Sequence, residues 1–426
     1  MKKKERRCCL NGWKIFALGL SLMVIYAGFF PLTAQEEKSR REKWIGDIDQ
    51  LAVELPAKHK DLFNKKPEGE FKNDIQELKE ALPELSDEEI IFSLSCIVAS
   101  VGDAHTSLYF QPGIAFPLTL YWFKDGIYVI DTAPEYEKIL HCRLIGIDQK
   151  SVDEVIKVIS RGIPHENSAQ IKKSVPYHLV LAEFLYGAGI IDSKERAEYG
   201  FQSQGGEKFT VELESISMKN RFPSVAPKIP EDILPLYRRN RDKFYHSTWL
   251  EEQNTLYVQY NSCQNMKDNP FSDFVNDVFQ RIDEKMVGKL IIDLRNNGGG
   301  NSSIFYPMLR EIKAREEINQ KDKLFVVIGR QTFSSAVLNA IQLRNQSNAT
   351  FVGEPTGGKP NHFGEVRNFM LTNSRLYISY STKYFTLSNE DMDSFYPDIT
   401  VELGFKDFIE NRDPVMEAIM NGMKMD

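Results

Sequence analysis

The sequence predicts a mixed α/β fold, and three apolar runs in its C-terminal half are the main reason. The runs 290–294, 324–328 and 350–352 have the length and composition of buried strands. Residues 303–314 and 336–345, which lie between them, carry apolar side chains at helical spacing. Strand, turn and helix repeated in this order are typical of parallel strands joined by crossover helices. Ligands bind at the carboxyl ends of such strands, so the three polar turns should share one functional edge.

Those turns carry residues suited to nucleophilic catalysis. Ser334 follows the second strand and opens a helix, whose free backbone N–H groups can stabilise an oxyanion. The glycines at 298–300 allow another backbone segment to approach closely. Lys359 follows the third strand and could accept the proton that a serine hydroxyl loses when it attacks. The simpler interpretation is that Ser334 only caps its helix and that the glycine-rich turn only reverses the chain.

Three motifs at these turns resemble the C-terminal processing (tail-specific) serine peptidases: 293–299 (DLRNNGG), 332–336 (TFSSA) and 353–359 (GEPTGGK). The tricorn core peptidases and the interphotoreceptor retinoid-binding protein repeats are related branches. The resemblance is strong over 245–405 and implies a crotonase-like ββα-type core with a serine–lysine dyad. Ser334 and Lys359 are 25 positions apart, which is similar to the family's spacing. Two departures are Pro360, where the family has glycine, and Val337, near which the family commonly has glutamate.

The resemblance implies further site residues. His105 lies where the tricorn branch carries a histidine as general base. Asp391 or Asp393 would orient the catalytic groups, and backbone N–H groups near Gly299 and Ser335 would hold the oxyanion. The alternatives are a capping or supporting role for His105 and a solvated loop for the two aspartates.

Residues 1–34 are predicted to be a secretory signal peptide or an N-terminal membrane anchor. Six basic side chains accompany an uncharged apolar run at 15–30, and the small residue Ala34 precedes Gln35. The run is long enough for an uncleaved anchor with its basic end inside the cell. Either form would place the rest of the chain in the periplasm, outside the cell, or on the outer side of a membrane.

Charge and cysteine content narrow the choice of partners. Without residues 1–34, which carry six basic side chains and one acidic one, the formal net charge of −7 becomes −12. Nucleic acid and anionic membrane surfaces are therefore excluded as partners, apart from the N-terminal segment itself. Cys96, Cys142 and Cys263 have apolar neighbours and are expected to be buried thiols. No metal-ligand spacing is present, and no metal or cofactor is expected.

Four segments are expected after the leader. Residues 36–110 form an N-terminal helical region, in which Ser86 and Glu89 make a capping box. Residues 111–165 resemble a shortened PDZ-like module, because a strand, a tight turn and an amphipathic helix follow one another at 144–156. Residues 166–245 are read as a proline-containing connecting region, and 246–426 as the catalytic domain.

Together these features predict an exported serine endopeptidase that acts on proteins or peptides. Ser334 is the expected nucleophile, with neutral Lys359 or else His105 as the base. The alternatives are a non-catalytic ligand- or peptide-binding protein on the same scaffold, and an esterase or amidase of small molecules. The peptidase is favoured because the serine and both bases occur together. Cleavage specificity and oligomeric state stay open.

Overall fold

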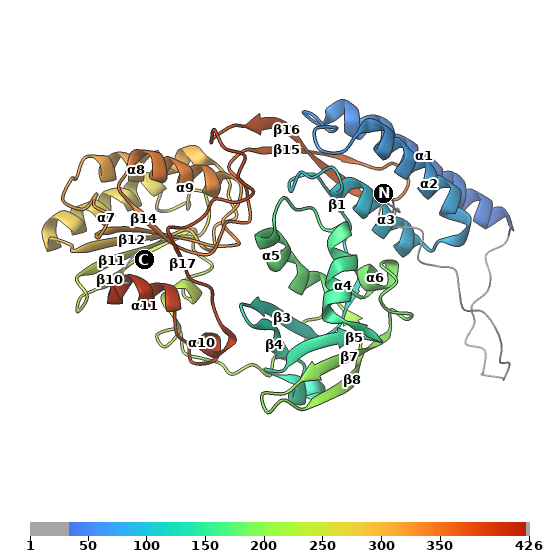
Figure 1. Cartoon of the computed structure of the whole chain (residues 1–426), viewed down its shortest axis with the longest axis horizontal. Helices are drawn as coiled ribbons and strands as arrows, with labels where there is room; N and C mark the ends of the chain where they lie inside the picture. Colours follow the sequence, from blue (N-terminus) through green and yellow to red (C-terminus); the bar gives the residue numbers. More distant parts are fainter. Residues whose placement is uncertain (1–33, 423–426) are drawn as a thin grey trace, which may run out of the picture.

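The computed structural model describes residues 34–422, so the predicted leader lies outside it except for Ala34, the first residue of a helix. The described chain forms two sheet-based parts and a group of N-terminal helices, and Figure 1 shows all three. Within residues 34–422, no helix combines the length and the apolar composition that crossing a membrane requires. The mixed α/β class predicted from the sequence is confirmed.

A six-stranded sheet organises the C-terminal part. Its strands, in spatial order, are β10 (Tyr245–Leu250), β11 (Thr255–Tyr260), β12 (Lys289–Asp293), β13 (Leu324–Ile328), β14 (Thr350–Gly353) and β17 (Ile399–Thr400). All neighbouring pairs from β11 to β17 are parallel, and only β10 runs antiparallel to its neighbour. The three apolar runs of the sequence are therefore β12, β13 and β14, side by side, and the turns that follow them lie at one edge of the sheet.

Helices cover both faces of this sheet, which explains why its central strands β12, β13 and β14 are largely apolar. On one face, alternate residues such as Leu290 and Ile292 pack against α7 (Phe271–Lys285), α8 (Tyr306–Lys313) and α9 (Ser335–Gln346) (Figure 1). On the other face, Ile291 and its neighbours pack against α11 (Pro414–Asn421). The short helix α10 (Phe405–Ile409) precedes α11.

A second, antiparallel sheet lies below the N-terminal helices in Figure 1. Its strands, in spatial order, are β3 (Leu118–Phe123), β4 (Gly126–Thr132), β5 (Arg143–Ile147), β7 (Arg196–Gln202) and β8 (Lys208–Glu214). The strand β3 is at the edge of this sheet. Three helices accompany it: α4 (Val152–Ile159), α5 (Ser168–His178) and α6 (Ala182–Gly187). The minor strands are β2 (Ile114–Ala115), β6 (Lys150–Ser151) and β9 (Ile216–Ser217).

This sheet extends beyond the predicted module boundary at residue 165. The predicted connecting region contributes α5, β7 and β8, and β7 pairs directly with β5. Ala197, Tyr199 and Phe201 alternate along β7 and face the core of this part, so the strand is a structural element rather than a linker. Irregular chain occupies most of 218–244, where the prolines are concentrated.

The N-terminal helical region is present as α1 (Ala34–Lys58), α2 (Glu68–Ala81) and α3 (Asp87–Ala99), and the capping box of Ser86 and Glu89 opens α3. These helices share a core with the hairpin of β15 (His362–Met370) and β16 (Tyr377–Phe385) (Figure 1). The strand β1 (Ser107–Tyr109) pairs with β16. The hairpin thus joins the turn that carries Lys359 to the segment that contains His105. The three cysteines of the described residues are buried and free, as expected.

Candidate active site

Ser334 lies at a tight turn between β13 and α9 in a strained backbone conformation. Its φ of 52° and ψ of −127° fall outside the regions that non-glycine residues normally occupy. Such a conformation costs on the order of 1–3 kcal/mol and is found mainly where function requires it. The Ser334 side chain makes no capping hydrogen bond to α9. Helix capping, the simpler interpretation of this serine, is therefore not its role.

The glycine turn packs directly against Ser334. Gly299 has a φ of +107°, and a Cβ added to it would lie 2.9 Å from the Ser334 Cβ. Asn297 fixes this turn, because its Nδ2 donates to the Tyr260 carbonyl at 2.8 Å and its own carbonyl accepts from the Phe333 N–H at 3.1 Å. Only a residue without a side chain allows the two turns to be this close.

The two predicted oxyanion donors differ in the structure. The Gly299 N–H donates to the Asn297 Oδ1 at 2.9 Å, so it is not available to a substrate in this conformation. The Ser335 N–H is at the first turn of α9, where no helix carbonyl can accept it. The Ser335 hydroxyl donates to the Gly300 carbonyl at 2.6 Å and ties the two turns together. Of the predicted pair, Ser335 is the donor that the geometry supports.

The turn that carries Lys359 (353–359, the lysine turn) also packs against the turn that carries Ser334 (332–336, the serine turn). A Cβ added to Gly358 would lie 3.4 Å from the Ser334 backbone nitrogen and 3.2 Å from Phe333. Lys359 is buried, and its Nζ donates to the Asp391 Oδ1 at 2.6 Å. The lysine lowers the pKa of Asp391, mainly through this hydrogen bond. A carboxylate partner favours the charged ammonium, whereas a general base must be neutral.

His105 approaches the turn that carries Ser334 from the N-terminal part of the chain. Its ring stacks on Phe333, the residue before Ser334, with centroids 4.4 Å apart and an interplanar angle of 27°. It also stacks on His362 at 5.7 Å. Both ring nitrogens of His105 are buried and have no hydrogen-bond partner among residues 34–422. The structure therefore places an imidazole with free nitrogens beside the serine turn.

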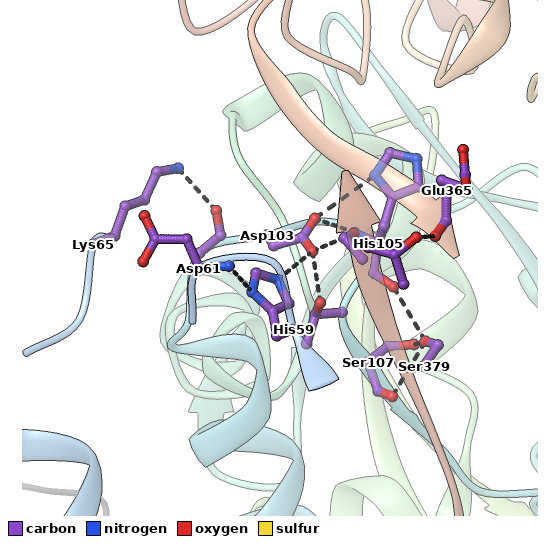
Figure 2. Close-up of polar contacts among 12 residues, drawn as sticks. His59, Asp61, Lys65, Asp103, His105, Ser107, Glu365 and Ser379 are labelled. Carbon is purple, nitrogen blue, oxygen red and sulfur yellow. Dashed lines mark hydrogen bonds and ion pairs between the residues drawn. The ribbon is translucent and has the colours of Figure 1, made fainter. Parts of the chain in front are cut away.

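Asp103 supplies a negative charge next to this imidazole, and Figure 2 shows it between His59 and His105. Its Oδ1 lies 3.7 Å from the His105 Nδ1, an electrostatic contact longer than a hydrogen bond. The other oxygen accepts from the hydroxyls of Thr106 and Ser381, both at 2.6 Å, and meets the His59 Nε2 at 3.1 Å. Burial alone would raise the pKa of Asp103, but contacts with His105, His59 and Ser381 hold it well below its usual range.

In the structure, the two aspartates expected to orient the catalytic groups have other partners than His105. Asp391 pairs with Lys359, and Asp393 accepts a 2.6 Å hydrogen bond from the Tyr396 hydroxyl. Within the described chain, neither aspartate makes a hydrogen bond or ion pair with His105. Their loop approaches from the side of the lysine turn, whereas Asp103 belongs to the same short turn as His105. The position of Asp103 two residues before His105 was the only sequence signal for this role.

Two further residues at this site had no signal in the sequence. Asn167 caps α5, and its Nδ2 donates to the backbone carbonyls of Thr356 at 3.1 Å and Asp393 at 2.7 Å. It therefore joins α5 to the lysine turn. The neighbouring Glu166 has a buried Oε2 without a hydrogen-bond partner in residues 34–422. Burial, and then the charge of Asp103, raise the pKa of Glu166 to about 8, so this carboxyl is neutral near pH 7.

The protonated Glu166 makes a testable contribution to stability. Its pKa rises from 4.5 to about 8 on folding, with Asp103 and Asp391 raising it and Lys65 and Lys359 lowering it. Between these values the unfolded chain loses the proton while the folded chain keeps it. Stability should therefore fall as pH increases from 4.5 to 8, by an amount on the order of a few kcal/mol.

The Glu166→Gln variant should lack this part of the pH dependence, because glutamine does not titrate. Urea unfolding of wild type and variant at pH 5 and pH 8 measures the difference in free energy of unfolding. Glu137→Gln, at an exposed position, is the matched control and should follow the wild type. Parallel pH dependence in wild type and Glu166→Gln would contradict the assignment of a neutral carboxyl.

Comparison with known proteins bears on this arrangement. The model of peptidase family S41 matches residues 254–321, which include the glycine turn and end before Ser334. The structure of mature CPAF matches with a TM-score of 0.62 and 14% sequence identity, over 91% of this chain and 99% of that chain. CPAF complexed with lactacystin gives 0.61 and 14%, over 90% and 99%. The photosystem II D1 C-terminal processing protease gives 0.40 and 13%, over 84% and 93%.

No match was found among the curated proteins that were searched. The family match nevertheless confirms the resemblance to the S41 peptidases, and the chain shares the fold of CPAF along most of its length. These findings support a serine-type peptidase, which is a hydrolase. The family match does not reach Ser334, Lys359 or His105, so the roles of these residues are proposals that depend on the geometry of the site.

Proposed function

We propose that this protein is an exported serine endopeptidase in which Ser334 attacks the peptide carbonyl and His105 accepts its proton. One observation carries the proposal. A buried imidazole with unbonded nitrogens stacks on Phe333, next to a strained serine whose hydroxyl does not cap its helix. Asp103, held in its anionic form, lies next to that imidazole (Figure 2).

The chemistry follows from these positions. His105 takes the proton from the Ser334 hydroxyl as the Oγ attacks, and Asp103 stabilises the resulting imidazolium. The N–H of Ser335, at the N-terminus of α9, faces the negative charge that develops on the carbonyl oxygen. His105 then donates its proton to the leaving amine. In the second half of the reaction His105 takes a proton from a water molecule, the water attacks the acyl group, and His105 returns the proton to the Ser334 Oγ. Substrate binding must bring a His105 nitrogen within hydrogen-bond distance of Ser334.

Lys359 is the competing base, and one observation favours it. The lysine turn packs against the Ser334 backbone through Gly358, so the buried Lys359 begins next to the nucleophile. Its ammonium, however, pairs with Asp391. Lysine could serve as the base only after that ion pair separates and the ammonium loses a proton. Within the proposal Lys359 is therefore a charged neighbour of the site, and His105 is the base.

A cavity of about 630 Å³ offers a path for the substrate. It is lined by the edge strand β3, by α5, by residues between 216 and 224, and by Arg330 and Gln331, which precede the serine turn. An edge strand presents unpaired backbone groups to which an extended peptide can add as a further strand. We therefore extend the proposal to a PDZ-like role for the second sheet with α5, and to a crotonase-like core for the six-stranded sheet.

Export is the part of the proposal that the N-terminal sequence alone supports. The basic residues and the apolar run at 15–30 should carry 36–426 across the membrane. A reporter enzyme that is active only outside the cytoplasm should be active when fused to the C-terminus. N-terminal sequencing that starts at Gln35 would support cleavage over anchoring. Activity of a reporter that works only in the cytoplasm would reject export.

A further inference from the structure

Lys173 is a cation without an acidic partner at the place where the cavity meets the serine turn. It is partly buried on α5, and its Nζ lies 5.4 Å from the ring centroid of Phe333, next to Ser334. Burial lowers its pKa below the ordinary lysine value. Among residues 34–422 it makes no hydrogen bond or ion pair. Its cation–π contact with Phe333 compensates only weakly for the water that it has lost, and a bound anion would stabilise the ammonium further.

Two neighbouring cations of the cavity already have acidic partners. Lys172 pairs with Glu402 at 2.9 Å, and Arg330 makes two 2.7 Å hydrogen bonds to the carboxylate of Glu354. Arg221 is also without an acidic partner in the described chain, but it is exposed. Lys173 is thus the partly buried cation of this cavity whose charge is available to a ligand.

The rest of the cavity suits an apolar segment of polypeptide. Its apolar lining includes Leu118, Leu120, Trp122, Pro176, Ile216 and Phe222. The acidic residue of the lining is Asp131, whose Oδ1 accepts from the backbone N–H groups of Thr132 and Ala226. An acidic group that enters beside Lys173 therefore meets an ammonium without an acidic partner, next to the apolar part of the lining.

We propose that Lys173 selects substrates with an acidic side chain close to the scissile bond, flanked by apolar residues that fill the cavity. This inference rests on the proposed peptidase function. A C-terminal carboxylate fits less well, because such groups are captured by backbone N–H groups in turns, and no glycine lines this cavity. Lys173 is also close to Phe333, which precedes Ser334. If the C-terminal carboxylate of a substrate bound to Lys173, almost no residues would separate that carboxylate from the cleaved bond.

Matched peptides test this selection in the full-length exported protein. Each peptide carries an apolar run and either Glu or Gln at one of the positions adjacent to the cut, and both ends are blocked by acetyl and amide groups. Wild type should cleave the best Glu peptide with a kcat/KM about tenfold to a hundredfold above that of its Gln partner, the range for a hydrogen bond to a charged group. In Lys173→Gln the Glu-to-Gln ratio should fall to near one. Lys173→Glu should instead favour a peptide with Lys at that position.

Lys157→Gln is the matched control, because Lys157 is an exposed lysine on the neighbouring α4 outside the cavity. It should keep the wild-type ratio. An unchanged ratio in Lys173→Gln, with a circular dichroism spectrum like that of wild type, would overturn the proposal. Faster cleavage only of peptides with a free C-terminus would overturn it too, because the selected group would then be the terminal carboxylate.

Binding separates this inference from the proposed function. Fluorescence anisotropy with Ser334→Ala should show tighter binding of the Glu peptide than of its Gln partner, and adding Lys173→Gln should remove the difference. If the Glu peptide binds more tightly but the wild type cleaves no peptide, the proposed peptidase function is rejected and the recognition of acidic side chains by Lys173 is retained. If the wild type cleaves peptides but neither cleaves nor binds the Glu peptide better than its Gln partner, the role of Lys173 is rejected and the proposed peptidase function is retained.

Discussion

The Ser334→Ala variant should lose peptide hydrolysis by about 10⁴-fold or more while keeping its fold. The reason is that Ser334 is the proposed nucleophile, and loss of a serine nucleophile has effects of this size in serine peptidases. The measurement is kcat on a fluorogenic peptide, with circular dichroism and thermal melting to confirm folding. Serine already adopts this φ of 52° in the wild type, so alanine adds little strain and stability should change little.

Ser335→Ala gives the contrast within the same turn. It removes only the hydroxyl that donates to the Gly300 carbonyl and keeps the backbone N–H. If Ser335→Ala abolished turnover while Ser334→Ala retained it, the nucleophile would be misplaced by one residue.

The His105→Ala variant should fall to the level of Ser334→Ala, whereas Lys359→Ala should retain measurable turnover well above it. His105 has free ring nitrogens and an anionic neighbour in Asp103, while the ammonium of Lys359 is bound to Asp391. The pH profile gives a second readout. A histidine base is expected to switch activity on near pH 6–7, where imidazole ordinarily titrates, and a lysine base at alkaline pH.

The opposite pattern would restore the serine–lysine dyad. It would consist of a Lys359→Ala variant as inactive as Ser334→Ala, a His105→Ala variant near wild type, and activity that rises only at alkaline pH. His105 would then be a supporting residue, and the ion pair of Lys359 with Asp391 would have to open before catalysis.

The core of the site could be predicted from the sequence because its signals are local. The strands β12, β13 and β14 are buried on both faces, so each appears as an almost continuous apolar run. The turn after such a run must lie at the carboxyl edge. Ser334 and Lys359 could be placed on that edge without any knowledge of long-range contacts, and the structure places their turns in contact.

The residues that the sequence did not reveal are joined to the site by long-range contacts. Asn167 reaches the lysine turn from a segment expected to be a connecting region, because α5 docks there. Asn297 was read as part of a glycine turn, although its side chain holds the Gly299 N–H that was expected to bind the oxyanion. The partner of His105 was sought at Asp391 and Asp393, since only the structure shows which loop approaches which side of Ser334.

Labelling with a fluorophosphonate probe, followed by mass-spectrometric mapping, tests the central claim most directly, because the probe reacts only with an activated serine. The claim is that His105 activates Ser334 for acyl transfer. We predict a single modified residue, Ser334, in the wild type and in Lys359→Ala, with labelling lost in His105→Ala. Modification of another serine, or labelling of Ser334 that persists in His105→Ala and disappears in Lys359→Ala, would contradict this account.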